Sequence, residues 1–445
     1  MNIKVGMVSL GCPKNQVDGE MMLSKARDAG FQIIADPALA DVVIINTCGF
    51  IQSAKEEAIE NILEFAALKK EGRIKKVIAT GCLAERYRDE VKKEIPELDA
   101  VVGIGANGDI ADIIKRCFAG EEVETFPDKV CLPMSGKRIL TSLPFVAYLK
   151  IAEGCDNRCS YCAIPAIRGR YRSRPMEEIL DEARSLAGHG VKELVVVAQD
   201  TTRYGQDLYG EYKLAELLKK LSALDGLKWI RVLYAYPERI TGELLQVIRD
   251  EDKIVKYLDI PLQHASARIL KAMNRHGDGK ALSAQMAHIR EAVPGIVLRT
   301  TLITGFPGET EEDFAELTEF VKQNRFDRLG CFAYSEEEGT PAASMPHQVP
   351  EEVRRRRAEV IMAEQLRIHD EKNREKIGAE TEVVVEGFDR YAECFFGRGT
   401  SDAPDIDTKV YFTGKKKLSV GQFVKIHIDD VLEYDLIGTV CGEEV

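Results

Sequence analysis

Two successive series of alternating strands and helices constrain most strongly how this chain can fold. In the first series, short apolar runs alternate with amphipathic helical patterns. Ser53 and Glu56 have the spacing of a capping box at the start of one expected helix. Repeated strand–helix units predict a parallel sheet covered by helices. The expected strands span 3–10, 41–46, 76–80 and 100–104, and the expected helices span 16–29, 53–70, 88–94 and 109–118.

The second series contains six strand–helix units. This number predicts an incomplete TIM-type (β/α)6 barrel, whose active site lies at the carboxyl ends of the strands. The expected strands are 145–152, 193–198, 229–234, 255–260, 296–303 and 329–334, with helices at 177–187, 213–221, 242–250, 279–292 and 311–323.

The pattern changes again near the end of the chain. A charged helix is expected over 350–376, and its arginine run 354–357 is typical of a solvated helix face. From Gly378 onward, five short alternating strands predict a small β-barrel. The sequence therefore predicts an α/β multidomain protein. We expect an N-terminal parallel βα sheet domain over 1–120, a linker over 121–143, a barrel core with its connecting helix over 144–376, and a small β-barrel over 377–445.

Composition limits the class of protein. A chain of 445 residues is too long for one ordinary core, and 45% hydrophobic with 30% charged residues is typical of a globular protein. No apolar run is long enough to span a bilayer, and residues 1–8 resemble a first strand more than a signal peptide. We therefore expect a cytoplasmic protein without membrane contact, in which the 11 cysteines stay reduced and metal ligation is favoured over disulfides. A net charge of −12 argues against a broad nucleic-acid footprint and makes any nucleic-acid contact secondary.

Three cysteines lie in one short run after the first strand of the second series. Cys155, Cys159 and Cys162 have the spacing C-x3-C-x2-C. Zinc sites usually have four ligands, and four-cysteine ferredoxin runs ligate every iron. Three thiolates can instead hold a four-iron cluster and leave one iron open for a small chelating molecule. A structural metal knot or chance clustering is the alternative.

Three further cysteines occupy equivalent positions in the first series. Cys12, Cys48 and Cys82 each follow an expected strand and precede a helix, at separations of 36 and 34 residues. Because ligands collect at the carboxyl ends of parallel strands, these thiolates could converge on a second cluster. Ordinary buried cysteines are the alternative. We interpret the remaining five as structural or incidental: Cys117, Cys131, Cys331, Cys394 and Cys441.

The run from Cys155 to Cys162 resembles the signature of the radical S-adenosylmethionine (radical SAM) enzymes, and the whole chain resembles the methylthiotransferases of that family. That family combines an N-terminal three-cysteine domain, a radical SAM core and a C-terminal TRAM barrel. The resemblance implies two [4Fe–4S] clusters, SAM and an external electron donor. It implies that the Cys155/Cys159/Cys162 cluster binds and reduces SAM, and that the Cys12/Cys48/Cys82 cluster carries the sulfur, which a separate SAM methylates before transfer.

Two branches of this family are best known, and local motifs favour one of them. Residues 11–20 (GCPKNQVDGE) resemble the GCPKN-x-VDSE motif of the ribosomal-protein branch, apart from Gly19 in place of Ser. Residues 162–169, 173–175 and 403–407 are also similar to this branch. It modifies the β-carbon of an aspartate in ribosomal protein S-twelve, so we expect that protein or the small ribosomal subunit as partner. The alternatives are a transfer-RNA adenosine methylthiotransferase and a non-catalytic iron–sulfur electron carrier or scaffold.

The charge of the expected small barrel bears on the partner. From residue 378 onward there are 7 Lys and Arg against 14 Asp and Glu, a net charge of 7 − 14 = −7. Such a surface favours a basic partner over phosphates, although acidity can also serve solubility alone.

Contacts to SAM are expected at the strand ends of the core. Gln199 and Gln263 follow two expected strands, and 300–310, which contains Ile303 and Gly305, resembles a family segment that borders the adenine. Glycines there permit close approach of the backbone. His264 could equally be a packed, hydrogen-bonded histidine. No side chain beyond the cluster ligands is assigned as a catalytic acid or base.

Overall fold

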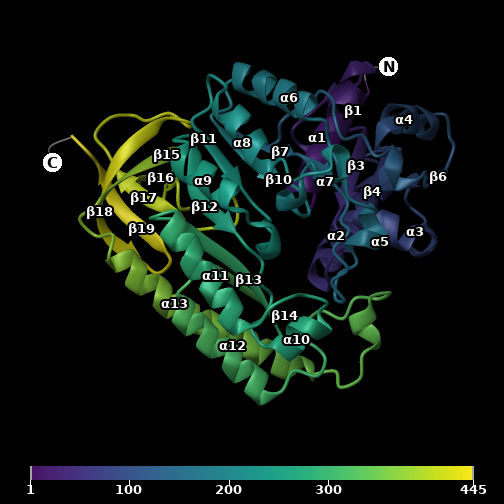
Figure 1. The fold of residues 1–445 in the computed structure, drawn as a ribbon. Coiled ribbons are helices and arrows are strands. Elements are labelled where there is room, and N and C mark those ends of the chain that lie inside the picture. Colours follow the sequence, from purple (N-terminus) through teal and green to yellow (C-terminus); the bar gives the residue numbers. More distant parts are fainter. Residues whose placement is uncertain (1–2, 443–445) are drawn as a thin grey trace.

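The computed structural model describes residues 3–442 and consists of three parts joined along the chain. In Figure 1 the purple and blue N-terminal part and the yellow C-terminal barrel lie on opposite sides of the teal and green core. No helix within residues 3–442 combines the length and apolar character needed to cross a membrane.

The N-terminal part is a six-stranded, fully parallel sheet in the order β2-β1-β3-β4-β5-β6. Apolar side chains of α1 and α4 pack on one face, and those of α2 and α3 pack on the other. The strands are β1 (Lys4–Ser9), β2 (Gln32–Ile33), β3 (Val42–Thr47), β4 (Lys76–Gly81), β5 (Ala100–Val102) and β6 (Val123–Thr125), and the helices are α1 (Pro13–Asp28), α2 (Gln52–Lys70), α3 (Cys82–Glu94) and α4 (Ile110–Phe118).

Three details of this part differ from the sequence-based expectation. The strand β6 lies inside the segment 121–143 that was expected to be a linker, so the first sheet continues past residue 120. The prediction of a capping box at Ser53 and Glu56 is wrong. The helix α2 begins at Gln52, and its N-cap residue Ile51 makes no side-chain hydrogen bond to the helix. The helix expected over 88–94 is the second half of α3, which has a non-helical kink at Arg88.

The core is an open, six-stranded parallel sheet in chain order. Helices pack against its outer face, whereas its inner face contacts α1 and the C-terminal barrel through residues such as Val17, Tyr257 and Ala403. The strands are β7 (Val146–Lys150), β10 (Glu193–Val197), β11 (Trp229–Val232), β12 (Ile254–Asp259), β13 (Val297–Thr304) and β14 (Arg328–Ala333). The helices are α6 (Met176–Gly188), α7 (Gln206–Tyr209), α8 (Leu214–Ser222), α9 (Gly242–Asp250), α10 (Ala267–Ala272), α11 (Gly279–Ala292), α12 (Glu311–Asn324) and α13 (Glu351–Arg374).

A small ribbon follows the first core strand and carries the cysteine run. The strands β8 (Ala152–Glu153) and β9 (Arg172–Ser173) pair antiparallel, and α5 (Ile164–Arg168) lies between them. This arrangement confirms the partial barrel and places the cysteine run beyond the carboxyl end of β7.

The C-terminal part is a closed five-stranded barrel in the order β15-β16-β17-β19-β18, as expected. Its docking contacts on the core are ionic as well as apolar: the fully buried Glu193 at the start of β10 pairs with Arg231 of β11 and with Arg398 of the barrel. The strands are β15 (Glu380–Asp389), β16 (Cys394–Gly399), β17 (Val410–Thr413), β18 (Phe423–Leu432) and β19 (Asp435–Val440).

Candidate functional site

The first three cysteines lie at the carboxyl ends of three neighbouring strands. Cys12 is the N-cap of α1 after β1, Cys48 directly follows β3, and Cys82 is the first residue of α3 after β4. These strands are adjacent in the sheet, so the three cysteines lie at the same edge of it. A Cβ atom added to Gly11 would lie only 2.8 Å from Cys48 Sγ, which shows how closely the turns before the helices approach each other.

The charge environment differs among these thiols. Burial alone would raise the pKa of Cys12, but the Lys14 and Arg168 cations and backbone N–H groups hold it below its ordinary value. Burial raises the pKa of the Cys82 thiol to about 12, although Arg168 Nη2 lies 3.6 Å from its Sγ. Both Cys12 and Cys48 influence the pKa of Cys82, as expected for three groups that share one site. A cation beside converging thiols suits a metal group held by thiolates.

The second three cysteines lie in the loop between β8 and α5. Burial raises the pKa of Cys155 to about 12 and raises that of Cys162 as well. Cys159 Sγ lies 3.9 Å from the Tyr236 hydroxyl and 3.9 Å from Arg275 Nη1. The charges of Cys155 and Cys159 also raise the pKa of Cys162, so the three thiols of this loop lie near one another.

Four fully buried charged side chains lie between the two cysteine sets. Arg168 Nη1 lies 2.8 Å from Asp18 Oδ2 and 3.0 Å from Glu153 Oε2, and Lys150 also pairs with both carboxylates. Burial would raise the pKa of Glu153, but Arg168 and Lys150 hold it well below its ordinary value, so Glu153 stays ionised. Because Arg168 also reaches Cys82 and Glu153 precedes Cys155 by two residues, this group ties the two sets together.

A second link joins the sets through aromatic residues at the end of β11. Lys14, which is 3% exposed, places its Nζ 3.4 Å from the centre of the Tyr234 ring. Burial would lower the pKa of Lys14, but Tyr234 and Cys12 raise it, so the ammonium stays protonated. Tyr236, two residues beyond Tyr234, is the residue that approaches Cys159.

The charged group and Lys14 were not identified from the sequence as site residues. Lys14 and Asp18 lie in the motif around Cys12, and Arg168 lies in the segment after Cys162, so their proximity to the cysteines was a usable signal. Nothing in the sequence indicates that Lys150 and Glu153 meet Asp18, which lies more than 130 residues away along the chain.

The residues expected to contact SAM lie at carboxyl ends of core strands. Gln199 follows β10, and Gln263 follows β12 with a φ of 74° and a backbone N–H that donates to the Thr301 carbonyl at 2.8 Å. Ile303 lies in β13 and donates its N–H to the Gln263 carbonyl at 2.8 Å. A Cβ on Gly305 would lie 2.3 Å from Arg354 Cγ, so this glycine accommodates α13. His264 is fully buried, and its Nε2 lies 3.2 Å from Glu309 Oε2. It is therefore the packed, hydrogen-bonded histidine that the sequence allowed as an alternative to a SAM contact.

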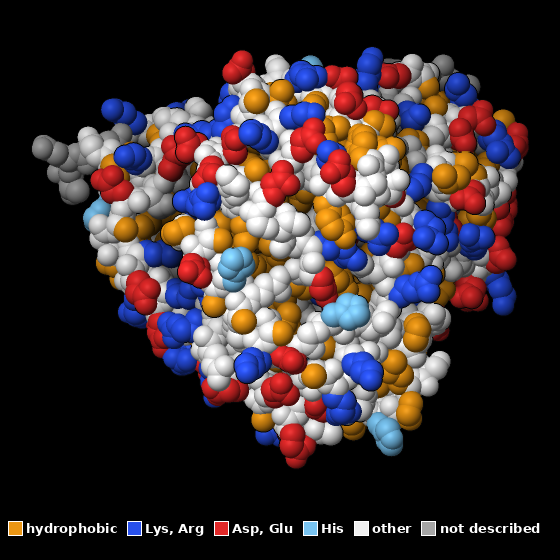
Figure 2. All heavy atoms as spheres, in the orientation of Figure 1, with side chains coloured by type: hydrophobic (Ala, Val, Ile, Leu, Met, Phe, Trp, Pro, Cys, Tyr) orange, Lys and Arg blue, Asp and Glu red, His pale blue; other side chains and the backbone are white. Residues whose placement is uncertain are grey.

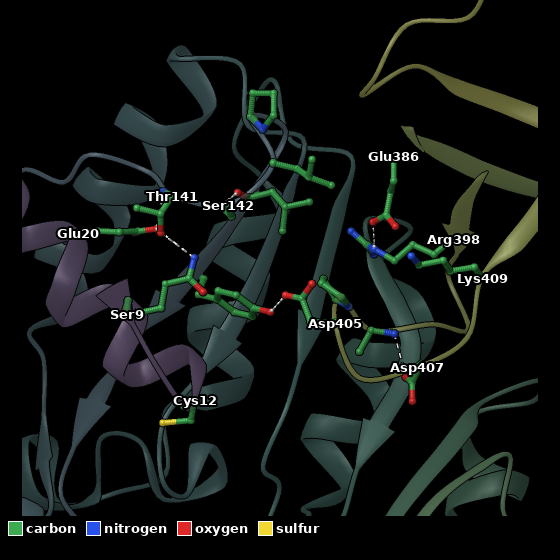
Figure 3. A pocket seen from close by; sticks show the side chains of 18 of the residues that line it. Ser9, Cys12, Glu20, Thr141, Ser142, Glu386, Arg398, Asp405, Asp407 and Lys409 are labelled. Carbon is green, nitrogen blue, oxygen red and sulfur yellow. Dashed lines mark hydrogen bonds and ion pairs between the residues drawn. The ribbon is translucent and has the colours of Figure 1, made fainter. Parts of the chain in front are cut away.

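A cavity of about 930 Å³ opens where the three parts of the chain meet (Figure 3). Cys12 lies at one end, the linker residue Thr141 bonds Glu20 at 3.0 Å, and the Tyr148 hydroxyl donates to Asp405 of the barrel at 3.1 Å. Four carboxylates and two cations line it: Glu20, Glu386, Asp405, Asp407, Arg398 and Lys409. A segment of another molecule could therefore reach Cys12 through a mostly acidic passage.

Comparison with known families agrees with this three-part organisation. Residues 4–103 match the Uncharacterized protein family UPF0004, residues 149–321 match the Radical SAM superfamily, and residues 377–441 match the TRAM domain. A relative from Clostridioides difficile is 49% identical over 99% of both chains, and one from Geobacter sulfurreducens is also 49% identical over 99% of both. Each is named ribosomal protein uS12 methylthiotransferase RimO.

This chain belongs to the radical SAM methylthiotransferase family. A third relative, from Pelotomaculum thermopropionicum, carries the same name and is 50% identical over 98% of this chain and 99% of its own. The predicted family resemblance is thereby confirmed over essentially the whole length. Membership of the radical SAM family implies SAM and a [4Fe–4S] cluster as cofactors.

Solved structures of other radical SAM enzymes share the fold of this methylthiotransferase but little of its sequence. The radical SAM methyltransferase TsrM from Kitasatospora setae is 13% identical, with a TM-score of 0.56 over 87% of this chain and 79% of that chain. The cobalamin-dependent radical enzyme OxsB has a TM-score of 0.52 at 13% identity, over 81% of this chain and 56% of that chain.

Proposed function

We propose that this protein adds a methylthio group to the β-carbon of an aspartate in ribosomal protein uS12, in the cytoplasm. The observation that carries the proposal is the whole-length match, at 49% identity, to relatives named for that activity. The motif at residues 11–20 supports the same branch of the family. A transfer-RNA methylthiotransferase and a non-catalytic iron–sulfur carrier are the competing functions, which the experiments below separate.

Two [4Fe–4S] clusters are proposed, one on each cysteine set. Cys155, Cys159 and Cys162 would hold one, and Cys12, Cys48 and Cys82 would hold the other. The chemistry of the donors supports this, because each set offers three thiols and one of them contacts a buried cation: Cys159 contacts Arg275, and Cys82 contacts Arg168. When bound, the clusters supply the electron that cleaves SAM and the sulfur that is transferred; an external donor supplies the electron in turn.

The protein's own contribution is position and exclusion of water. The ion group of Asp18, Lys150, Glu153 and Arg168 fixes the first cysteine set against the core, because each charge has lost its hydration and depends on the others. A buried, rigid link of this kind keeps the two reacting centres at a constant separation. The proposed SAM contacts are Gln199, Gln263, Ile303 and Gly305. At Gly305, α13 already occupies the space that a side chain would fill.

The passage to Cys12 supports a basic protein substrate. Its lining is mostly acidic, and the barrel that forms one wall has a net charge of −7 by sequence. On the face shown in Figure 2, acidic and basic side chains are intermixed without a broad basic patch. The acidic lining of the cavity and the acidic barrel attract a basic protein and repel the phosphates of RNA.

Product analysis tests the proposed substrate. The anaerobically reconstituted enzyme, with SAM, sulfide and a reductant, is incubated separately with uS12 and with transfer RNA, and both are analysed by mass spectrometry. We expect the mass of a methylthio group on one aspartate of uS12 and none on the RNA. A methylthio-adenosine in the RNA would establish the competing substrate, and the absence of 5′-deoxyadenosine would indicate an electron carrier.

Iron analysis tests the two proposed clusters. The reconstituted wild-type chain should contain about eight irons, as two four-iron clusters require. Replacing Cys12, Cys48 and Cys82 with Ala should halve that number while reductive SAM cleavage persists. The matched control replaces Cys131, Cys394 and Cys441, which lie outside both sets, and should keep all the iron. Loss of SAM cleavage with the core cluster retained would refute this division of roles.

A further inference from the structure

Lys14 is a buried cation whose charge no carboxylate balances. Among residues 3–442 no Asp or Glu forms an ion pair with it, and its charge meets the side chain of Tyr234. Other buried cations of the chain are paired differently: Lys150 and Arg168 each contact two carboxylates, and Arg231 and Arg398 share Glu193. An ammonium has three N–H donors, so an aromatic partner leaves hydrogen-bonding capacity unused in a desolvated place.

Lys14 forms part of a chain of contacts that runs from the first cysteine set toward the second. It follows Cys12 by two residues, and its ammonium rests on Tyr234 at the end of β11. Tyr236 on the same segment approaches Cys159 of the other set at 3.9 Å. These contacts place the Lys14 ammonium next to a segment of the core that reaches the second cysteine set.

The platform under Lys14 is fixed by its own backbone. Tyr234 has a φ of 61°, which is uncommon for an aromatic residue, and its N–H donates to Asp259 Oδ2 at 3.1 Å. Asp259 is itself paired with Arg299 at 3.0 Å, so this carboxylate already has partners and forms no ion pair with Lys14 among the described residues. The Tyr234 ring therefore holds the ammonium in place and supplies no counter-charge.

We propose that Lys14 binds the carboxylate of the target aspartate and so positions its β-carbon between the two cysteine sets. This inference rests on the proposed function. It assigns recognition of the negatively charged aspartate side chain to the Lys14 ammonium. A carboxylate would supply the negatively charged acceptor that Lys14 has from no Asp or Glu of the described residues, and the pair would form away from water, where a charge-assisted hydrogen bond discriminates strongly. Lys14 is thus a specificity-determining residue that acts by direct contact with substrate.

A double-mutant cycle separates this role from simple balancing of charge at Cys12. Binding of uS12, and of uS12 whose target aspartate is replaced by asparagine, is measured for the reconstituted wild-type enzyme and for Lys14→Met. The wild type should bind the aspartate form roughly 10- to 100-fold more tightly, as expected for a hydrogen bond to a charged group. Lys14→Met should bind both forms within about threefold, because the two changes remove one interaction.

Three further variants test whether the positive charge of residue 14 causes the preference for aspartate. Lys14→Arg should retain the preference for aspartate, and Lys14→Gln should lose it as Lys14→Met does. Lys25→Met, an exposed lysine on the same helix, should behave as wild type. Iron content is compared for every variant, so a loss of the cluster is seen directly.

The outcomes distinguish the inference from the proposed function. If Lys14→Met and Lys14→Gln keep the wild-type preference for aspartate, the inference is overturned while the proposed function stands. If the wild type neither binds nor modifies unaltered uS12, the proposed function is overturned and the inference with it.

Discussion

In the ion group of Asp18, Lys150, Glu153 and Arg168, the stability of the fold depends on each single side chain. Two carboxylates and two cations share one fully buried site and pair with one another. Replacing both partners of such a pair with apolar groups can be neutral, but removing one leaves a buried charge uncompensated. The arrangement joins α1 of the N-terminal part to β7 and α5 of the core.

The substitution Asp18→Asn should therefore destabilise the protein strongly. Lys150 and Arg168 would share the single carboxylate of Glu153, and breaking a buried ion pair costs about 3–5 kcal/mol. Urea denaturation of the wild type and the variant measures the loss. Asp28→Asn is the matched control, since Asp28 lies at the end of the same helix, half-exposed, and should change stability by less than about 1 kcal/mol. Equal midpoints for Asp18→Asn and Asp28→Asn would contradict this account.

Individual residues also show what sequence alone could and could not reveal. The placement of Cys12, Cys48 and Cys82 after strands could be inferred, because strand ends recur with the length of one strand–helix unit. The partners of Arg168 could not, because Asp18 is 150 residues away and nothing local in the sequence encodes that contact. The expected SAM contacts rest on the same strand-end logic and remain predictions.

At the scale of single elements, the turn from β4 into α3 decides where Cys82 lies. Gly81 has a φ of 93°, a region accessible mainly to glycine, and it starts the helix directly at the cysteine. The sequence pattern indicated only the second half of α3, because the kink at Arg88 breaks the helical periodicity.

Gly81→Ala should disturb this turn and the first cysteine set together. An added Cβ would lie 2.4 Å from the Thr47 carbonyl oxygen and 2.6 Å from the Thr47 nitrogen, so β3 or Cys82 must move. We expect a loss of more than about 2 kcal/mol, because strain in a glycine-only conformation costs about 1–3 kcal/mol before any clash. Chemical denaturation measures the loss, and iron content after reconstitution reports on the cysteine set.

Gly72→Ala separates backbone strain from the clash. Gly72 also has a positive φ, of 76°, but an added Cβ would meet nothing within 4 Å. The Gly72→Ala variant should therefore lose only the stability that backbone strain costs, and it should bind as much iron as the wild type. If Gly81→Ala were no worse than Gly72→Ala, the contact with Thr47 would have no role in placing Cys82.

For the whole molecule, the order of the three parts could be predicted from the periodicity of the chain, but their mutual contacts could not. The period changes from strand–helix units to short strands near residue 378, which is why the C-terminal barrel was foreseen. Its docking depends on Glu193, Arg231 and Arg398, which come from three distant segments. The cavity that leads to Cys12 exists only because this barrel closes one side of it.

A buried histidine makes the docking of the barrel sensitive to pH. His369 of α13 has Nε2 2.8 Å from the Tyr434 carbonyl oxygen of the barrel, and Nδ1 3.2 Å from Arg328 Nη1. Arg328 can only donate, so Nδ1 accepts and the ring is neutral. Burial and the Arg328 cation lower the pKa of His369 below its ordinary value. The neutral ring therefore stabilises the folded state.

This lowered pKa sets the direction of the expected pH effect. Stability from His369 is fully present above the ordinary histidine pKa of about 6.5 and is lost as pH falls below it, because the unfolded chain takes up the proton first. The midpoint temperature of thermal unfolding of the wild type should thus fall between pH 7.5 and pH 5.5. The midpoint temperature of His369→Gln should fall by less over the same range. His276→Gln, an exposed histidine, is the control and should follow the wild type. A pH dependence of His369→Gln as steep as that of the wild type would place the sensitive group elsewhere than at the junction of α13 and the barrel.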